Sequence, residues 1–143
     1  MNKVYFCRAM DTFHFDEIKN QYVEIDKLLS NEGFELINKF SMDNFSSITE
    51  NSTHEFITDN ANRIVEKDLE NLKKTDFVIV DLSIENHFYF GCICEIVYAY
   101  LWKKKIIVFT GKSKNGSRLW LHYHADYICE TLEESIKYII NYK

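Results

Sequence analysis

A short, uninterrupted apolar run at residues 77–80 (FVIV) is the feature that most limits the possible folds of this chain. It has the length of a strand and shows no alternation of polar and apolar positions. Such runs are typical of parallel strands that are covered on both faces. A similar run at 105–109 (KIIVF) follows an apolar segment of helical length at 90–102. Together these three segments predict a β-α-β unit at the centre of an α/β fold.

The rest of the chain continues the alternation of strands and helices. Further strands are predicted at 3–8, 34–38 and 126–129, and further helices at about 16–30, 54–74 and 132–141. The polar stretch 39–53 is predicted to be a long loop that covers a site, and 118–125 a short aromatic-rich segment. The pattern predicts a single domain over residues 1–143 with a doubly wound, five-stranded parallel sheet, flavodoxin- or Rossmann-like, in the strand order 2-1-3-4-5.

Composition narrows the classes of partner. A net charge of -5 argues against a nucleic-acid polymer or an anionic membrane as the main partner. No stretch reaches the length of an apolar membrane helix, and the amino terminus lacks the pattern of an export signal. We therefore expect a cytoplasmic protein.

Neither cysteine nor histidine spacing indicates a metal site. The four cysteines, Cys7, Cys92, Cys94 and Cys129, lack paired C-x-x-C spacing and are predicted to be reduced core thiols. The His-x-His at 122–124 has no carboxylate or cysteine at ligand spacing beside it. We expect no metal.

One acid, Glu95, interrupts the apolar helical segment at 90–102. Every other residue there is apolar, aromatic or small, which predicts a buried helix. An ionised carboxylate inside it is costly unless it is solvated, paired or used. Because the helix is predicted to begin near residue 90, its positive end favours the anion, and we expect Glu95 to be ionised at neutral pH.

A second acid, Asp68, lies on the apolar stripe of the helix at 54–74, together with Ile64 and Leu72. In a sheet of the predicted order, ligands bind at the carboxyl ends of the first and third strands, beside the start of the Glu95 helix. Two carboxylates brought together there, Glu95 and either Asp68 or Asp81, suit glycosyl chemistry, with one as nucleophile and the other handling protons or orienting it.

Five segments taken in order resemble the nucleoside 2-deoxyribosyltransferase family, including its 2'-deoxynucleoside 5'-phosphate N-hydrolase branch. They are 4–7 (VYFC), 66–72 (EKDLENL), 76–82 (DFVIVDL), 91–99 (GCICEIVYA) and 105–109 (KIIVF). The fourth is similar to the family's G-x-x-x-E-[LI]-G-x-A motif, with Val97 in place of its second glycine.

The resemblance implies an enzyme that cleaves the N-glycosidic bond of a deoxyribonucleoside or its 5'-monophosphate and needs no cofactor. It implies that Glu95 is the nucleophile and forms a covalent glycosyl intermediate, that Asp68 assists protonation of the base, and that Tyr5 holds the nucleophile or sugar. It also implies a homo-oligomer in which the neighbour's segment at about 117–120 completes the site. The partners expected are a small-molecule nucleoside or nucleotide and a free nucleobase.

Six further residues are candidates for substrate contact at the predicted edge of the sheet. These are Cys7, Arg8, Asp81, Tyr89, Gly91 and Arg118. Two of them depart from the family: Arg8 stands where small residues are usual, and Tyr89, six positions before Glu95, replaces an acid in the transferase branch and a serine in the hydrolase branch.

Alternatives stay open at this stage. In one alternative the enzyme transfers the sugar to another nucleobase, and in the other, the hydrolase reaction, it transfers the sugar to water. A third reading is a receiver-like signalling domain, because Asp11, Asp81 and Thr110 follow three of the predicted strands. A fourth is a nucleotide-binding relative that keeps the pocket but has no catalytic turnover. The structural alternative for Glu95 is a buried acid paired with a cation such as Arg8 or Arg118.

Overall fold

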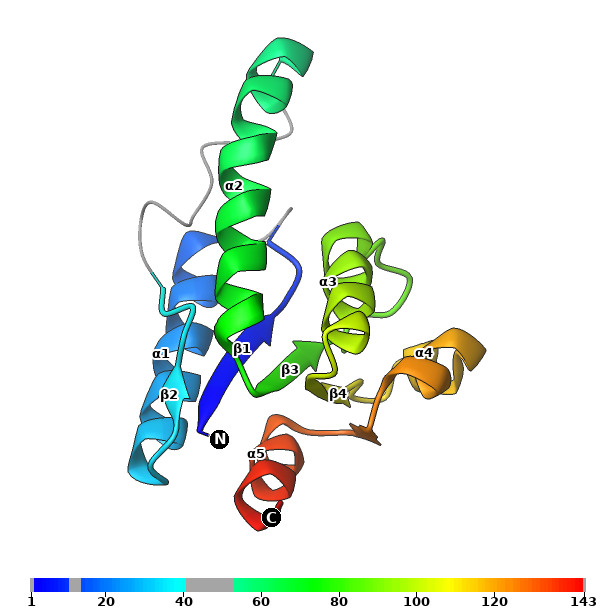
Figure 1. The fold of residues 1–143 in the computed structure, drawn as a ribbon. Helices are drawn as coiled ribbons and strands as arrows, with labels where there is room; N and C mark the ends of the chain where they lie inside the picture. The colour runs from blue at the N-terminus through cyan, green and yellow to red at the C-terminus, as the bar shows by residue number, and fades with distance from the viewer. Residues whose placement is uncertain (1, 11–13, 41–52, 143) are drawn as a thin grey trace.

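The computed structural model describes residues 2–10, 14–40 and 53–142. Its five strands form one all-parallel sheet in the order β2-β1-β3-β4-β5, which confirms the predicted class and strand order (Figure 1). The strands are β1 Lys3–Cys7, β2 Glu35–Leu36, β3 Phe77–Asp81, β4 Lys105–Phe109 and β5 Tyr127–Cys129.

The helices are α1 Phe15–Asn31, α2 His54–Lys74, α3 Phe90–Leu101, α4 Leu119–His124 and α5 Leu132–Asn141, with a 3₁₀ turn, η1, at Lys114–Ser117. Most bounds agree with the predictions to within two residues. The aromatic-rich segment is a helix, α4, and β2 is shorter than the predicted strand 34–38. Most of the predicted loop, 41–52, lies outside the described residues. Among the described helices, none combines the length and apolarity needed to cross a membrane.

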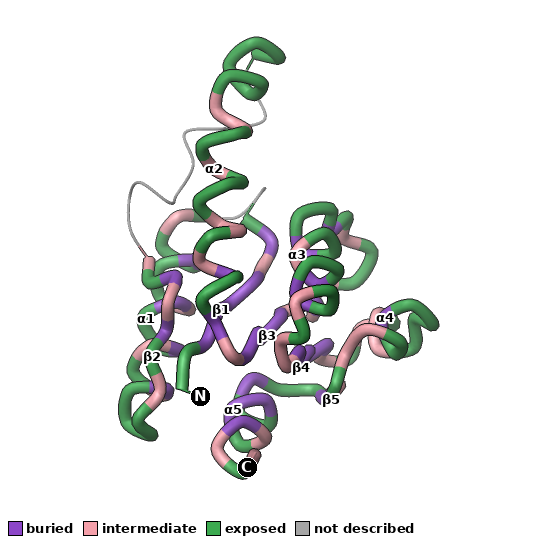
Figure 2. Tube along the Cα trace, viewed as in Figure 1, coloured by how far each residue is buried: buried purple, intermediate pink, exposed green. Residues whose placement is uncertain are grey.

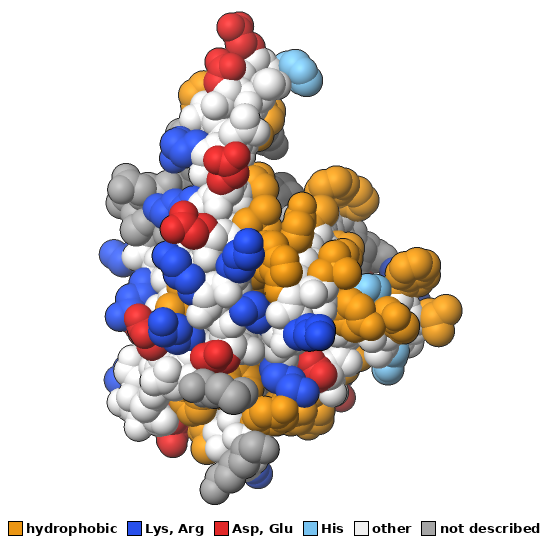
Figure 3. All heavy atoms as spheres, in the orientation of Figure 1, with side chains coloured by type: hydrophobic (Ala, Val, Ile, Leu, Met, Phe, Trp, Pro, Cys, Tyr) orange, Lys and Arg blue, Asp and Glu red, His pale blue; other side chains and the backbone are white. Residues whose placement is uncertain are grey.

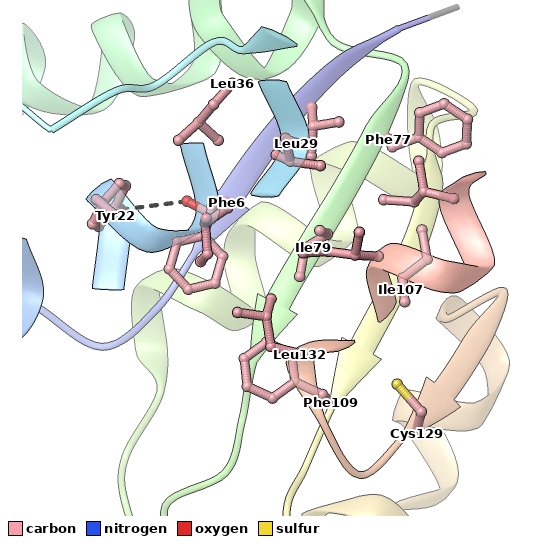
Figure 4. Close-up of a cluster of buried hydrophobic side chains, with 14 of the residues drawn as sticks. Phe6, Tyr22, Leu29, Leu36, Phe77, Ile79, Ile107, Phe109, Cys129 and Leu132 are labelled. Carbon is pink, nitrogen blue, oxygen red and sulfur yellow. Dashed lines mark hydrogen bonds between the residues drawn. The ribbon is translucent and has the colours of Figure 1, made fainter. Parts of the chain in front are cut away.

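Side-chain alternation along the strands divides the core into two clusters. On one face, Phe6 and Ile79 pack with α1 and α5, through residues such as Tyr22 and Leu132 (Figure 4). On the other face, strand residues pack with α2, α3 and α4. Because β-strand side chains alternate, Tyr5 and Cys7 point to this second face while Phe6 points to the first.

Helix α3 corrects the prediction of a wholly buried helix. Only Cys92, Ile96 and Ala99 of α3 are buried, in one stripe against the sheet. Its other sides carry exposed apolar residues, and Phe90 is 69% exposed. The physical reason is that one stripe suffices to cover the sheet, so the remaining apolar residues of α3 lie on the surface of this chain (Figure 2).

The order of the strands positions the site. β1 and β3 are neighbours, and the chain leaves them in opposite directions, β1 toward β2 and β3 toward β4. Their carboxyl ends therefore form the switch point at which open α/β sheets bind ligands.

Candidate active site

A cavity of about 150 Å³ lies at the carboxyl end of β1, between α1, α2 and α3. Its walls include Tyr5, Cys7, Arg8, Asn38, Asp68 and Glu95. The structure thus brings together all three predicted catalytic residues and two of the six predicted substrate contacts, although they come from three separate elements.

The Tyr5 phenol donates a hydrogen bond to Oε2 of Glu95. Tyr5 is 3% exposed, and burial, followed by the charge of Glu95, raises the pKa of Tyr5 well above 10. The phenol therefore keeps its proton and remains a donor at every physiological pH. A bond from a neutral donor to a carboxylate fixes the Glu95 oxygen and stabilises its charged form.

Burial raises the pKa of Glu95 from 4.5 to about 7. The Tyr5 bond opposes this effect, the charge of Asp68 adds to it, and the Cys7 thiol, also hydrogen-bonded to the carboxylate, opposes it. The expectation of a fully ionised Glu95 at neutral pH is therefore wrong, because desolvation outweighs the favourable helix dipole. Near pH 7 the group is close to half ionised.

Asp68 reaches the same cavity from α2, and burial raises its pKa from 3.8 to about 6, against a lowering by the Lys67 charge. Because Asp68 ionises first, its charge acts on Glu95, whereas Glu95 is still neutral when Asp68 titrates. Between about pH 6 and 7 the two carboxyls hold one proton between them. Because the pKa of Asp68 is the lower of the two, this proton resides mainly on Glu95, and the form with charged Glu95 and protonated Asp68 is the minor one. Nucleophilic attack by Glu95 with Asp68 as the general acid proceeds from that minor form.

Arg8 is held at the cavity by a chain of polar contacts. Its Nη1 donates to Oε1 of Gln21, and Nε2 of Gln21 donates to Oδ2 of Asp81 at 3.0 Å. The other Asp81 oxygen, Oδ1, accepts hydrogen bonds from the backbone N–H and the hydroxyl of Ser83. Both oxygens of Asp81 are thus occupied within the chain. Asp81 supports Arg8 and the loop after β3, and it is not among the residues that border the cavity.

Three solved structures resemble the whole chain. A 2-deoxyribosyltransferase from Leishmania mexicana matches with a TM-score of 0.65 and 15% identity, over 99% of each chain. A 2-deoxyribosyltransferase from Bacillus psychrosaccharolyticus matches with a TM-score of 0.64 and 18% identity, over 99% of this chain and 92% of the other. A CMP N-glycosidase from Clostridium botulinum matches with a TM-score of 0.57 and 15% identity, over 96% and 98%.

This chain has the 2-deoxyribosyltransferase fold. The resemblance inferred from five sequence segments is therefore confirmed at the level of fold. Comparisons of the sequence with protein-family models and with curated proteins give no match.

The other predicted contacts of this 2-deoxyribosyltransferase fold lie elsewhere. Tyr89 and Arg118 border a second cavity, of about 290 Å³, between α3 and α4. The Tyr89 oxygen accepts a hydrogen bond from the backbone N–H of Ile84 at 2.9 Å, which braces the loop before α3. Gly91 lies exposed in the first turn of α3. Their contact with substrate remains a prediction.

Sequence reasoning missed two residues that contribute to the cavity. Gln21 supports Arg8 from α1, and Asn38 follows β2 and forms part of the cavity wall. Asn38 had a detectable signal, because it is a polar residue at the carboxyl end of a strand next to the switch point. Gln21 had none, since it is one of many polar residues on an amphipathic helix.

Proposed function

We propose that this protein is a nucleoside 2-deoxyribosyltransferase-like enzyme that cleaves the N-glycosidic bond of a deoxyribonucleoside. The observation that carries the proposal is the Glu95 carboxylate, bound by the Tyr5 phenol in a cavity that also holds Asp68. The similarity of fold to two 2-deoxyribosyltransferases and an N-glycosidase supports it.

In the first step, an oxygen of ionised Glu95 attacks the anomeric carbon of the sugar. The bond between that carbon and the base nitrogen breaks, and its electron pair leaves with the base. Asp68, in its protonated form, gives its proton to the departing base. The products are a free base, an ionised Asp68 and a sugar joined to Glu95 by an ester bond.

In the second step, a nitrogen of an incoming nucleobase attacks the same carbon and displaces the Glu95 carboxylate. Asp68 accepts the proton that the incoming base loses, so both carboxyls return to their starting forms. The Tyr5 hydrogen bond is strongest when Glu95 is charged, at the start and end of the cycle. It therefore favours the ionised form of Glu95 before the attack and helps the carboxylate leave in the second step.

The second candidate is a 5'-monophosphate N-glycosidase, in which water takes the place of the second base. Two cationic residues favour a phosphorylated substrate, because Arg8 and Lys39 both border the cavity that contains Glu95. The CMP N-glycosidase among the structural neighbours is consistent with this candidate. The same Glu95 and Asp68 serve both reactions.

A homo-oligomer is part of the proposal. Exposed apolar side chains gather over α3 and α4 (Figure 3). They are Phe88, Phe90, Ile93, Val97, Tyr98, Tyr100, Leu101, Leu119, Trp120 and Tyr123, which we call the α3–α4 surface. Leu119 is 81% exposed and Trp120 is 78% exposed. Apolar patches of this kind mark protein interfaces, and a second copy that covers it would bring its own 117–120 segment near this one.

The experiment that tests the function is incubation of the protein with deoxynucleosides and with their 5'-monophosphates, with and without a second free base. Chromatography then separates three outcomes. Base exchange supports the transferase, and free base without an acceptor supports the glycosidase. Neither product with any substrate contradicts the proposal.

Variants assign the chemistry to Glu95. Glu95→Ala and Glu95→Gln remove the nucleophile and are expected to lower the rate by at least about 10³-fold. The matched control is Glu66→Gln, an exposed glutamate on α2, which should keep the wild-type rate. Full activity in either Glu95 variant contradicts the mechanism.

A further inference from the structure

The β1–β2 ladder ends early, just where the cavity begins. β2 has only two residues, and its pairing with β1 ends at Val4 and Leu36. The last backbone hydrogen bond between these segments runs from the N–H of Ile37 to the carbonyl of Val4, at 2.8 Å. Backbone groups of a strand alternate in direction, so Phe6 is the next residue whose N–H and C=O point toward the β2 side.

The Asn38 side chain takes the place of the missing strand. The backbone N–H of Phe6 donates to Oδ1 of Asn38 at 2.9 Å, and Nδ2 of Asn38 donates to the carbonyl of Phe6 at 2.7 Å. Both bonds are buried, and Asn38 is only 9% exposed. A side-chain amide places an N–H donor beside a carbonyl acceptor, so it can replace a backbone peptide at the edge of a sheet.

Phe6 lies between the two β1 residues that contact Glu95. Tyr5 donates its hydrogen bond to the carboxylate, and the Cys7 thiol bonds to the same group. Tyr5, Phe6 and Cys7 are all paired with β3, on the other side of β1. On the β2 side, Phe6 is held by Asn38 together with a longer contact of 3.4 Å from the Tyr22 hydroxyl to its carbonyl (Figure 4).

We propose that Asn38 is a positioning residue: by holding both backbone polar groups of Phe6, it keeps Tyr5 and Cys7 in the register that places their donors against Glu95. The inference rests on the proposed function only in that Glu95 is the nucleophile. Asn38 borders the cavity, but its two side-chain polar atoms are bonded to β1, so it acts through its neighbours rather than on substrate.

The test is the pKa of Glu95, measured by ¹³C NMR titration of labelled glutamate carboxyls in the free protein. The groups that act on Glu95 are Tyr5 and Cys7 on β1 and Asp68 on α2. Asn38→Leu keeps the branched shape of the side chain and removes both bonds to Phe6. We expect the Glu95 pKa to rise by about one unit, because the Tyr5 bond that stabilises the carboxylate becomes misaligned.

Two controls separate positioning from loss of stability. Thr75→Val removes a hydrogen bond of 2.8 Å from the buried Thr75 side chain to the carbonyl of Lys3, at the opposite end of β1, and should leave the Glu95 pKa unchanged. In a Tyr5→Phe background the bond to Glu95 is already absent, so adding Asn38→Leu should move the pKa much less than it does in the wild type.

An unchanged Glu95 pKa in folded Asn38→Leu protein overturns the proposal, as does an equal rise in the Tyr5→Phe background. If Asn38→Leu does not fold, Asn38→Ser, whose hydroxyl can still bond Phe6, provides the same titration with a smaller expected rise. With an active enzyme, kcat near pH 7 should fall about fivefold, as the ionised fraction of Glu95 does, while KM changes little. Because the titration needs no turnover, it stands even if the proposed reaction fails.

Discussion

Replacing the proposed nucleophile should stabilise the protein, and only at higher pH. Glu95→Gln keeps the shape of the side chain and an oxygen that can accept the Tyr5 bond, but removes the buried charge. The pKa of Glu95 is about 7 in the folded protein, against an ordinary value of 4.5. A carboxyl with a raised pKa holds its proton more tightly when folded, so its ionisation opposes folding.

The magnitude follows from these two pKa values. Between pH 4.5 and 7 the folded protein binds more protons at Glu95 than the unfolded chain does, so wild-type stability falls as pH rises through this window. Above pH 7 the loss reaches about 3 kcal/mol. Glu95→Gln avoids it, so the variant should be about 3 kcal/mol more stable at pH 8 and equally stable below pH 4.5. The raised pKa of Asp68 affects both proteins and largely cancels in the difference.

The assay is urea denaturation of both proteins across this pH range, with stability taken from the midpoint and slope. Glu66→Gln, on the exposed side of α2, serves as the control and should show no gain that depends on pH. A Glu95→Gln protein that is no more stable than wild type at pH 8, or one whose gain in stability is the same at every pH, would refute the idea that Glu95 is a desolvated carboxyl with a raised pKa.

Three other outcomes test the site and its surface. Tyr5→Phe should raise the Glu95 pKa by about one to two units, because it removes a bond to the charged form; NMR titration reads this directly. Asp68→Asn should lower kcat by about 10²–10⁴-fold, because the departing base no longer receives a proton from this residue. The loss should be much smaller for a substrate whose base leaves without protonation, and a comparison of kcat for the two kinds of substrate measures this difference. Trp120→Glu should dissociate the proposed oligomer, as measured by light scattering, and lower activity. Val23→Glu, at an exposed position of α1, should do neither.

Local patterns in the sequence were enough to predict the fold. Continuous apolar runs mark β3 and β4, and periodic apolar positions mark α1 and α2, because each pattern records which sides of one element are covered. The strand order followed from the right-handed crossovers that such alternation requires. The prediction overestimated only the length of β2, where pairing stops after two residues and the Asn38 side chain takes over.

The sequence by itself also determined which acids stood out. Glu95 interrupts an apolar segment and Asp68 lies on an apolar stripe, and both observations need only residue type and spacing. How the charge of one acid affects the pKa of the other depends on the tertiary structure. Tyr5 and Glu95 are 90 positions apart in the chain, and their hydrogen bond exists only because β1 and α3 pack together.

Only the tertiary structure decided the protonation of Glu95 and the surroundings of α3. The helix dipole is a local property and favours an ionised Glu95, whereas desolvation depends on everything packed around the carboxyl and proved stronger. In the same way, the apolar sequence of α3 predicts that the helix is covered, but it does not tell which part of the molecule covers it. One stripe is covered by the sheet of this chain, and the rest forms the exposed α3–α4 surface.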